Sequence, residues 1–233
     1  MRPMPSATMD VLNEFFEDAT ELDRPVLQPR VLLASQSPRR RQLLLEYGIE
    51  FETVSAKVDD GLLVRGGVSP SEWVAALGYF KAAAAMRDLG EWPYAPGEVI
   101  IVGADTIVLK GNQIIGQPRS AVDAERILRL LENGSHSVLT GVAMIDAGSG
   151  QRDMFVDRAT VQVGEIGHDA IRAYVDSGAW RGKAGAYNLR ERLDASWPIT
   201  YSGDPTTIMG LPMGQLKRRL VEFADRCAKS SLV

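Results

Sequence analysis

Residues 31–45 read VLLASQSPRRRQLLL, which passes from an apolar segment through a small polar turn into a helix. Residues 31–34 are predicted as a strand, and Pro38 takes the first helical position, where a missing N–H costs nothing. Ser37 is the expected N-cap, because its hydroxyl can accept a backbone N–H of the first turn. We therefore expect a strand that ends in a polar turn and leads directly into a helix.

Three consecutive arginines, Arg39, Arg40 and Arg41, follow at the positive end of this helix. Each cation placed there is expected to cost about 0.3–1 kcal/mol, the amount that a well-placed anion would gain. Guanidinium groups beside a helix N-terminus can instead bind phosphate oxygens together with the backbone N–H groups. The stretch thus indicates either a phosphate site or a solvated basic turn.

A second informative stretch, EVIIVGADTIVL, occupies residues 98–109. Its two ends are almost entirely β-branched and apolar, a pattern typical of strands buried on both faces. Asp105 interrupts this run, and a carboxylate there is costly unless it is paired, hydrogen-bonded or bound to a metal. Asp105 is therefore a candidate functional acid. The alternative is an aspartate that caps a bend between two strands.

Most of the remaining chain alternates helical and strand patterns. Ser69 and Glu72 form a capping box that predicts a helix over residues 69–87, and Lys81 lies near its middle among alanines, where a lysine is usually solvated. Residues 177–191 are predicted as a glycine-rich turn that leads into a strand, and residues 200–211 as a loop. Further predictions are strands at 49–54, 114–115, 136–145 and 154–163, the last two as an antiparallel hairpin, and helices at 123–132, 168–174 and from about 212.

Composition limits the class of protein. The chain has 233 residues, which favours one large α/β domain with an appendage, and residues 1–30 are predicted as that extension, with a short acidic amphipathic helix at 10–22. A net charge of −4 argues against nucleic acid as a partner. Cys227 is the only cysteine, and no apolar run is long enough for a membrane span. We expect a cytoplasmic protein without a membrane partner.

Five motifs resemble those of the Maf-like nucleoside triphosphate pyrophosphatases: LASQSPRR at 33–40, GADT at 103–106, HSVLTG at 136–141, GKAGAY at 182–187 and GLP at 210–212. The resemblance implies an α/β fold, with a mixed, elongated sheet flanked by helices and two lobes around a central cleft, in a domain at residues 31–233. It also implies a homodimer that hydrolyses a nucleoside triphosphate to the monophosphate and pyrophosphate with Mg²⁺ or Mn²⁺. The SPRR and ADT motifs resemble the dTTP/UTP branch of this family.

The same resemblance implies roles for individual residues. The catalytic positions are Asp105, which takes a proton from water, and Lys81. The metal ligands are Asp105 and Asp60, which stands where the family commonly has glutamate. The phosphate-binding positions are Ser35, Ser37, Arg39, Arg40 and Lys183. The positions linked to base choice are Arg39, Thr106 and Arg190.

Two departures from the family pattern leave a second function open. Gln117 stands where the family usually has lysine, which removes a positive charge, and Arg190 stands where the dTTP/UTP branch has glutamine. The charge balance is kept if Arg190 reaches the phosphates. The alternative is a catalytically weakened nucleotide-binding regulator of cell division, of the septum-formation inhibitor type.

Overall fold

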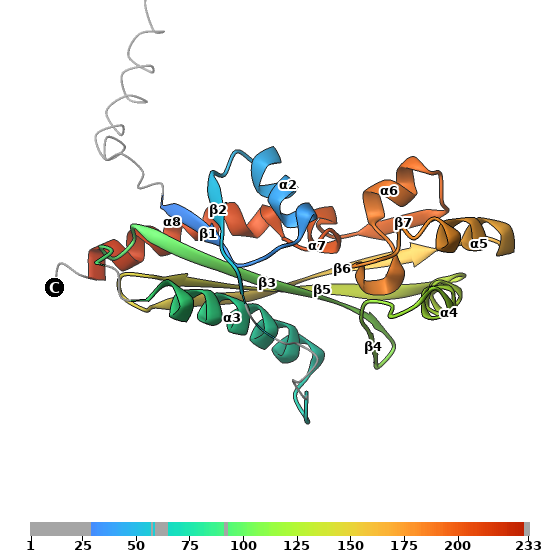
Figure 1. The fold of residues 1–233 in the computed structure, drawn as a ribbon, viewed down its shortest axis with the longest axis horizontal. Helices are drawn as coiled ribbons and strands as arrows, with labels where there is room; N and C mark the ends of the chain where they lie inside the picture. The colour runs from blue at the N-terminus through green and yellow to red at the C-terminus, as the bar shows by residue number, and fades with distance from the viewer. Residues whose placement is uncertain (1–28, 57, 59–64, 91–92, 231–233) are drawn as a thin grey trace, which may run out of the picture.

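A seven-stranded mixed sheet forms the frame of this computed structural model, which describes residues 29–56, 58, 65–90 and 93–230 (Figure 1). Its strands are β1 (Arg30–Leu33), β2 (Phe51–Thr53), β3 (Val99–Lys110), β4 (Gln113–Ile115), β5 (Gly134–Asp146), β6 (Arg152–Val163) and β7 (Ile199–Ser202). Their order is β2-β1-β3-β5-β6-β7, and β4 pairs with β3. β1 runs parallel to β2 and β3, and the other pairings are antiparallel.

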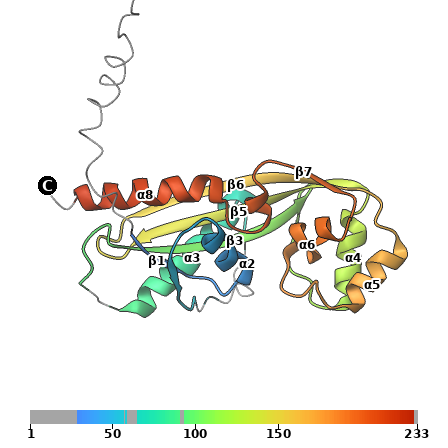
Figure 2. The ribbon, with the colours of Figure 1, turned by 90° about the horizontal axis from the view of Figure 1, so that it is seen from above.

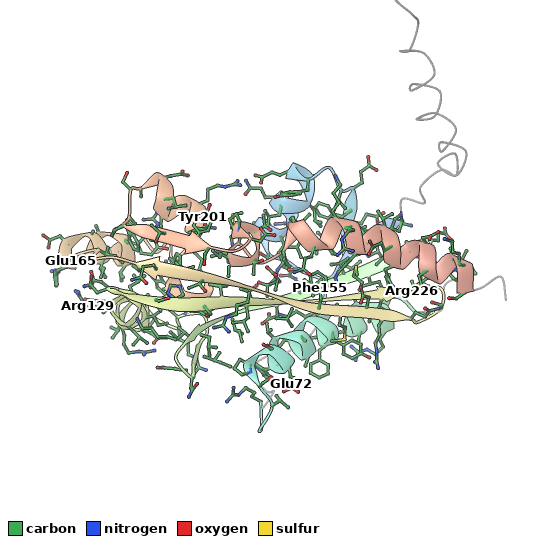
Figure 3. All side chains as sticks on the ribbon, turned by 180° about the vertical axis from the view of Figure 1, so that it is seen from behind. Glu72, Arg129, Phe155, Glu165, Tyr201 and Arg226 are labelled. Atoms are coloured by element: carbon green, nitrogen blue, oxygen red, sulfur yellow. The ribbon has the colours of Figure 1, made fainter. Side chains whose placement is uncertain are left out.

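Helices cover both faces of this sheet. They are α2 (Pro38–Glu46), α3 (Pro70–Leu89), α4 (Ala121–Leu131), α5 (His168–Asp176), α6 (Leu189–Asp194), α7 (Pro205–Ile208) and α8 (Met213–Ser230). Figure 3 shows α3, which carries Glu72, and α8, which carries Arg226, on opposite faces of the long strands. The sheet with its flanking helices confirms the predicted α/β class.

The long strands β3, β5 and β6 pass through two lobes that lie end to end (Figure 2). In one lobe α8 packs on the face that carries Ala104, Val142 and Phe155, and α3 packs on the opposite face. In the other lobe the same strands form a second core with α4, α5 and α6, around Val108 and Val138. The sheet is therefore the element that the two lobes share.

Two of the predicted helix starts are confirmed in detail, and one is not. The capping box of α3 is present, because Ser69 Oγ accepts from the Glu72 N–H at 3.2 Å and the Glu72 carboxylate accepts from the Ser69 N–H at 2.8 Å. α8 begins at Met213, directly after the predicted start at Pro212. Ser37 occupies the N-cap position of α2, but its hydroxyl makes no capping hydrogen bond.

Two local predictions were wrong, and one alternative is excluded. The alternative in which Asp105 caps a bend is excluded because β3 runs without a break from Val99 to Lys110. The strand predicted within 177–191 is instead a 3₁₀ turn, Ala184–Ala186, followed by α6, since the Asn188 side chain caps the helix by accepting from the Glu191 N–H at 3.1 Å. The loop predicted at 200–211 contains the end of β7 and the whole of α7.

Two predictions fall outside the described residues: the amphipathic helix at 10–22 and the metal ligand Asp60. The division of the chain at residue 30 stays a prediction. Across the part of the chain that the structure describes, no helix combines the length and the apolar character needed to cross a bilayer.

Candidate active site

One cavity of about 460 Å³ between the two lobes brings most of the predicted site residues together. The predicted residues that line it are Ser35, Ser37, Arg39, Arg40, Lys81, Asp105, Thr106, Gln117 and Lys183. One wall comes from the β1–α2 turn and the middle of β3, and the facing wall comes from residues 181–191. The acid of β3 and the arginines of α2 therefore share a single cavity.

An ion pair with Lys81 of α3 compensates the cost of placing the Asp105 carboxylate in an apolar strand. Both side chains are only 16% exposed, so each charge depends on the other for compensation. The pair joins the middle of β3 to the helix that packs on it. It places a carboxylate and an ammonium group side by side on the cavity wall.

Three glycines allow α3 to approach the sheet closely enough for this pair to form. A Cβ on Gly103 of β3 would lie 2.3 Å from the carbonyl oxygen of Gly78, and a Cβ on Gly141 of β5 would lie 2.4 Å from that of Val74. Any side chain at either strand position would push the helix away from the sheet. Because Lys81 follows Gly78 by one turn, this close packing sets how far its ammonium group stands from β3.

Arg40 is buried, at 8% exposure, and its guanidinium is anchored at three corners. Nε donates to the Gly210 carbonyl at 2.7 Å. Nη1 donates to Ser35 Oγ at 3.1 Å, and Nη2 donates to Thr106 Oγ1 at 3.2 Å. The arginine thus ties together the β1–α2 turn, β3 and the segment that precedes α8, and it holds a fixed positive charge at the cavity wall.

The facing wall carries a carboxylate that the sequence analysis missed. Glu191 lines the cavity and forms an ion pair with Lys183, whose side chain is only 12% exposed. Arg39 stands at the same end and donates from Nη2 to the Gly182 carbonyl at 3.3 Å. Burial lowers the pKa of Arg39, and the negative charge of Glu191 opposes that shift. Asn188 followed three residues later by Glu191 is a capping-box spacing, which signals the start of α6 but not that the carboxylate pairs with Lys183.

Arg190 does not reach the cavity. Its guanidinium binds Glu46 at the end of α2 with two hydrogen bonds, of 2.7 and 3.1 Å, and it is not among the residues that line the cavity. This ion pair connects the two lobes at an exposed position. The condition under which Arg190 restores the charge missing at Gln117, that it reaches the phosphates, is therefore not met here, and its link to base choice stays a prediction.

Tyr187 forms part of the cavity wall and is held from behind by His136 of β5. The two side chains are joined by a hydrogen bond of 2.8 Å between His136 Nε2 and the Tyr187 hydroxyl. Burial, with a smaller effect from the charge of Lys110, lowers the pKa of His136 to about 4. A neutral imidazole therefore supports the tyrosine at neutral pH.

Five positively charged and two negatively charged side chains line the cavity. The cations are Arg39, Arg40, Lys81, Arg181 and Lys183, and the carboxylates are Asp105 and Glu191. Such an excess favours a polyanionic ligand. The described residues contain no cluster of three or more His, Cys, Asp or Glu side chains that could hold a metal ion by themselves.

The fold and the cavity together define an α/β protein with a cationic pocket between two lobes. The family model described as Maf-like protein matches residues 30–223, and this chain belongs to that family. The resemblance of the five motifs is thereby confirmed.

Two curated relatives are similar over most of the chain. The dTTP/UTP pyrophosphatase of Pelotomaculum thermopropionicum is 35% identical over 193 residues, which cover 83% of this chain and 96% of the relative. The dTTP/UTP pyrophosphatase of Salinibacter ruber is 36% identical over 202 residues, which cover 86% of this chain and 95% of the relative.

A solved structure of a nucleoside-triphosphatase, the dITP/XTP pyrophosphatase of Mycobacterium abscessus, superposes with a TM-score of 0.36 at 14% identity. The match covers 57% of this chain and 74% of that one. The superposition is too loose to support a conclusion about this chain.

Proposed function

We propose that this chain is a nucleoside triphosphate pyrophosphatase that cleaves the bond between the α and β phosphates and releases pyrophosphate. The observation that carries this proposal is the single cavity that the Asp105–Lys81 pair shares with Arg39 and Arg40. The two curated relatives described above, both named dTTP/UTP pyrophosphatase, support the same reaction and favour dTTP and UTP as substrates.

Asp105 is the proposed general base. Its carboxylate accepts a proton from the attacking water, and the water oxygen forms a bond to the α-phosphorus. The bond from that phosphorus to the bridging oxygen breaks, and its electron pair leaves with pyrophosphate. Lys81 fixes the position of the carboxylate, since the two side chains are directly paired.

The arginines and Lys183 are the proposed phosphate-binding groups. Negative charge increases on the leaving pyrophosphate as the bond breaks, and positive groups already held in place stabilise it without reorganisation. Arg40 meets this requirement best because three hydrogen bonds fix its guanidinium. Lys183 is paired with Glu191, so a phosphate has to compete with that carboxylate for the ammonium group.

A divalent metal ion, Mg²⁺ or Mn²⁺, fits the donor set. Asp105 offers carboxylate oxygens at the cavity wall, and Mg²⁺ is commonly held by one or two carboxylates together with water and substrate phosphates. When bound there, such an ion supplies positive charge that polarises the phosphate oxygens. Asp60 is the second proposed ligand and lies outside the described residues. The homodimer and the cytoplasmic location expected from the sequence remain predictions.

A panel of nucleoside triphosphates tests the proposal. The full-length chain is incubated with each nucleotide and either Mg²⁺ or Mn²⁺, and pyrophosphate is measured by a coupled assay. We expect release from dTTP and UTP in the presence of the metal and loss of activity when a chelator is added. Nucleotide binding without pyrophosphate release from any nucleotide, with either metal, would contradict the proposal and favour the nucleotide-binding regulator.

A further inference from the structure

A row of buried and half-buried polar groups crosses the sheet behind the cavity. Thr106 of β3 pairs in register with Thr140 of β5, and Thr140 pairs with Asp157 of β6. Thr140 is fully buried, and so is Thr207 of α7, which contacts this row. The row separates the core beneath α8 from the core of the α4–α6 lobe. Polar groups buried between two apolar cores need complete hydrogen bonding to be tolerated.

The hydroxyl protons in this row have a definite direction. Thr140 Oγ1 donates to the carbonyl oxygen of Thr207 at 2.8 Å, and a hydroxyl group has only one proton to give. In the 2.9 Å contact between Thr106 Oγ1 and Thr140 Oγ1, Thr106 is therefore the donor. Thr106 consequently presents lone pairs, and not its proton, to Arg40 Nη2 at 3.2 Å.

A carboxylate holds the far end of the row. The Thr207 hydroxyl donates to Asp157 Oδ2, and Gln215 Nε2, in the first turn of α8, donates to Asp157 Oδ1 at 2.6 Å. An ionised carboxylate only accepts hydrogen bonds, so it directs both donors toward itself. Thr207 is thereby fixed with its carbonyl oxygen available to Thr140. The chain of hydrogen bonds runs from the cavity wall to the base of α8.

We infer that Thr140, Thr207 and Asp157 are positioning residues for Arg40 and act on it through Thr106. This inference rests on the proposed function, in which Arg40 binds the phosphates. Without the Thr140 hydroxyl, the Thr106 proton loses its acceptor, and the row no longer orients the Thr106 lone pairs toward the guanidinium. The hydrogen bond from Arg40 Nη2 to Thr106 Oγ1 would then weaken, and the guanidinium would be held less firmly.

A double-mutant cycle tests whether Thr140 acts through Arg40. Thr140→Val removes the hydroxyl at nearly constant volume, and Thr140→Ser keeps it. We expect Thr140→Val to lower kcat/KM about tenfold, as for a lost hydrogen bond to a charged group, and Thr140→Ser to restore most of the activity. In an Arg40→Lys background, Thr140→Val should have less than about a twofold further effect, because coupled residues are not additive. Thr160→Val, at an exposed threonine of β6, is the matched control and should leave the activity unchanged.

The inference is overturned if Thr140→Val reduces activity by the same factor in both backgrounds, or if Thr140→Ser loses as much as Thr140→Val. Should Thr140→Val fail to fold, Asp157→Asn replaces it in the same cycle, because it removes the charge that directs Thr207. Calorimetric binding of inorganic pyrophosphate to each variant separates this inference from the proposed reaction. A wild-type chain that binds pyrophosphate but hydrolyses no nucleotide refutes the proposed function alone. In that case the double-mutant cycle is evaluated on the Kd for pyrophosphate, and this tests the positioning role independently of hydrolysis.

Discussion

Replacing Gly78 with alanine tests the close packing of α3 on the sheet. In the middle of a helix this exchange usually stabilises a protein by about 1 kcal/mol, since alanine has the higher helix propensity. Here the added Cβ would lie 2.9 Å from the Gly141 carbonyl oxygen and 3.3 Å from its carbon, where ordinary contacts begin at 3.4 Å. The helix has to move outward by about 0.5 Å to relieve this contact. Lys81, one turn along, moves with it.

The size of the effect on activity follows from that displacement. A misplacement of about 1 Å in a catalytic arrangement can lower the rate about a hundredfold. A displacement of about half that size is therefore expected to lower kcat by about three- to tenfold. Gly103→Ala is a harsher variant, because its Cβ would lie 2.3 Å from the Gly78 carbonyl oxygen. We expect it to reduce kcat further, or to prevent folding.

Pyrophosphate release and thermal unfolding are measured on the same preparations. Gly67→Ala is the control, since a Cβ there meets no atom within 4 Å and its backbone is not in the left-handed region. We expect Gly78→Ala to lower both Tm and kcat, and Gly67→Ala to change neither. A Gly78→Ala variant with a raised Tm and full kcat would show that the interface between α3 and β5 accommodates a Cβ at this position, and would refute the packing argument.

Three further predictions concern the surroundings of the cavity. Because the pKa of His136 is lowered to about 4 in the folded chain, the unfolded chain binds a proton first as the pH falls below about 6.5. The free energy of unfolding should then drop by on the order of 3 kcal/mol toward pH 4, and His136→Gln should flatten this slope in chemical denaturation curves. Glu191→Gln removes the competitor for Lys183 and should lower the KM for nucleotide about two- to fivefold; an unchanged KM would show that this partly exposed pair does not compete with phosphate. Arg190→Ala should leave the ratio of kcat/KM for UTP and CTP unchanged, because the guanidinium binds Glu46 outside the cavity; a changed ratio would return Arg190 to base choice.

The sequence identified those elements whose signals are local. The alternation and capping patterns located the long strands, α3 and α8, because the burial of one face and the capping of one end depend on neighbouring residues. The unusual position of Asp105 in an apolar run indicated a carboxylate that needs compensation, and the ion pair with Lys81 is one of the forms of compensation expected. The short helices α6 and α7 were missed, since each has few residues and depends on a single capping side chain.

The partners of charged residues were harder to predict than the residues themselves. Arg190 and Glu46 are 144 positions apart, and only the folded chain brings them together. The resemblance to a family located Arg190 at a motif position, but it could not show that its guanidinium points toward the other lobe and away from the cavity. Glu191 carried a capping signal and was missed because its role in the cavity depends on the fold around Lys183.

The central claim is that Asp105 performs the chemistry in a cavity whose cations bind the phosphates. Pyrophosphate release and nucleotide binding should be measured side by side for the full-length chain and for Asp105→Asn, with Mg²⁺ and the nucleotide that the wild type prefers. Loss of a general base is expected to reduce the rate by about 10²–10⁴-fold, while the Kd for the nucleotide stays within about threefold of the wild type. An Asp105→Asn variant that releases pyrophosphate at the wild-type rate would contradict the account.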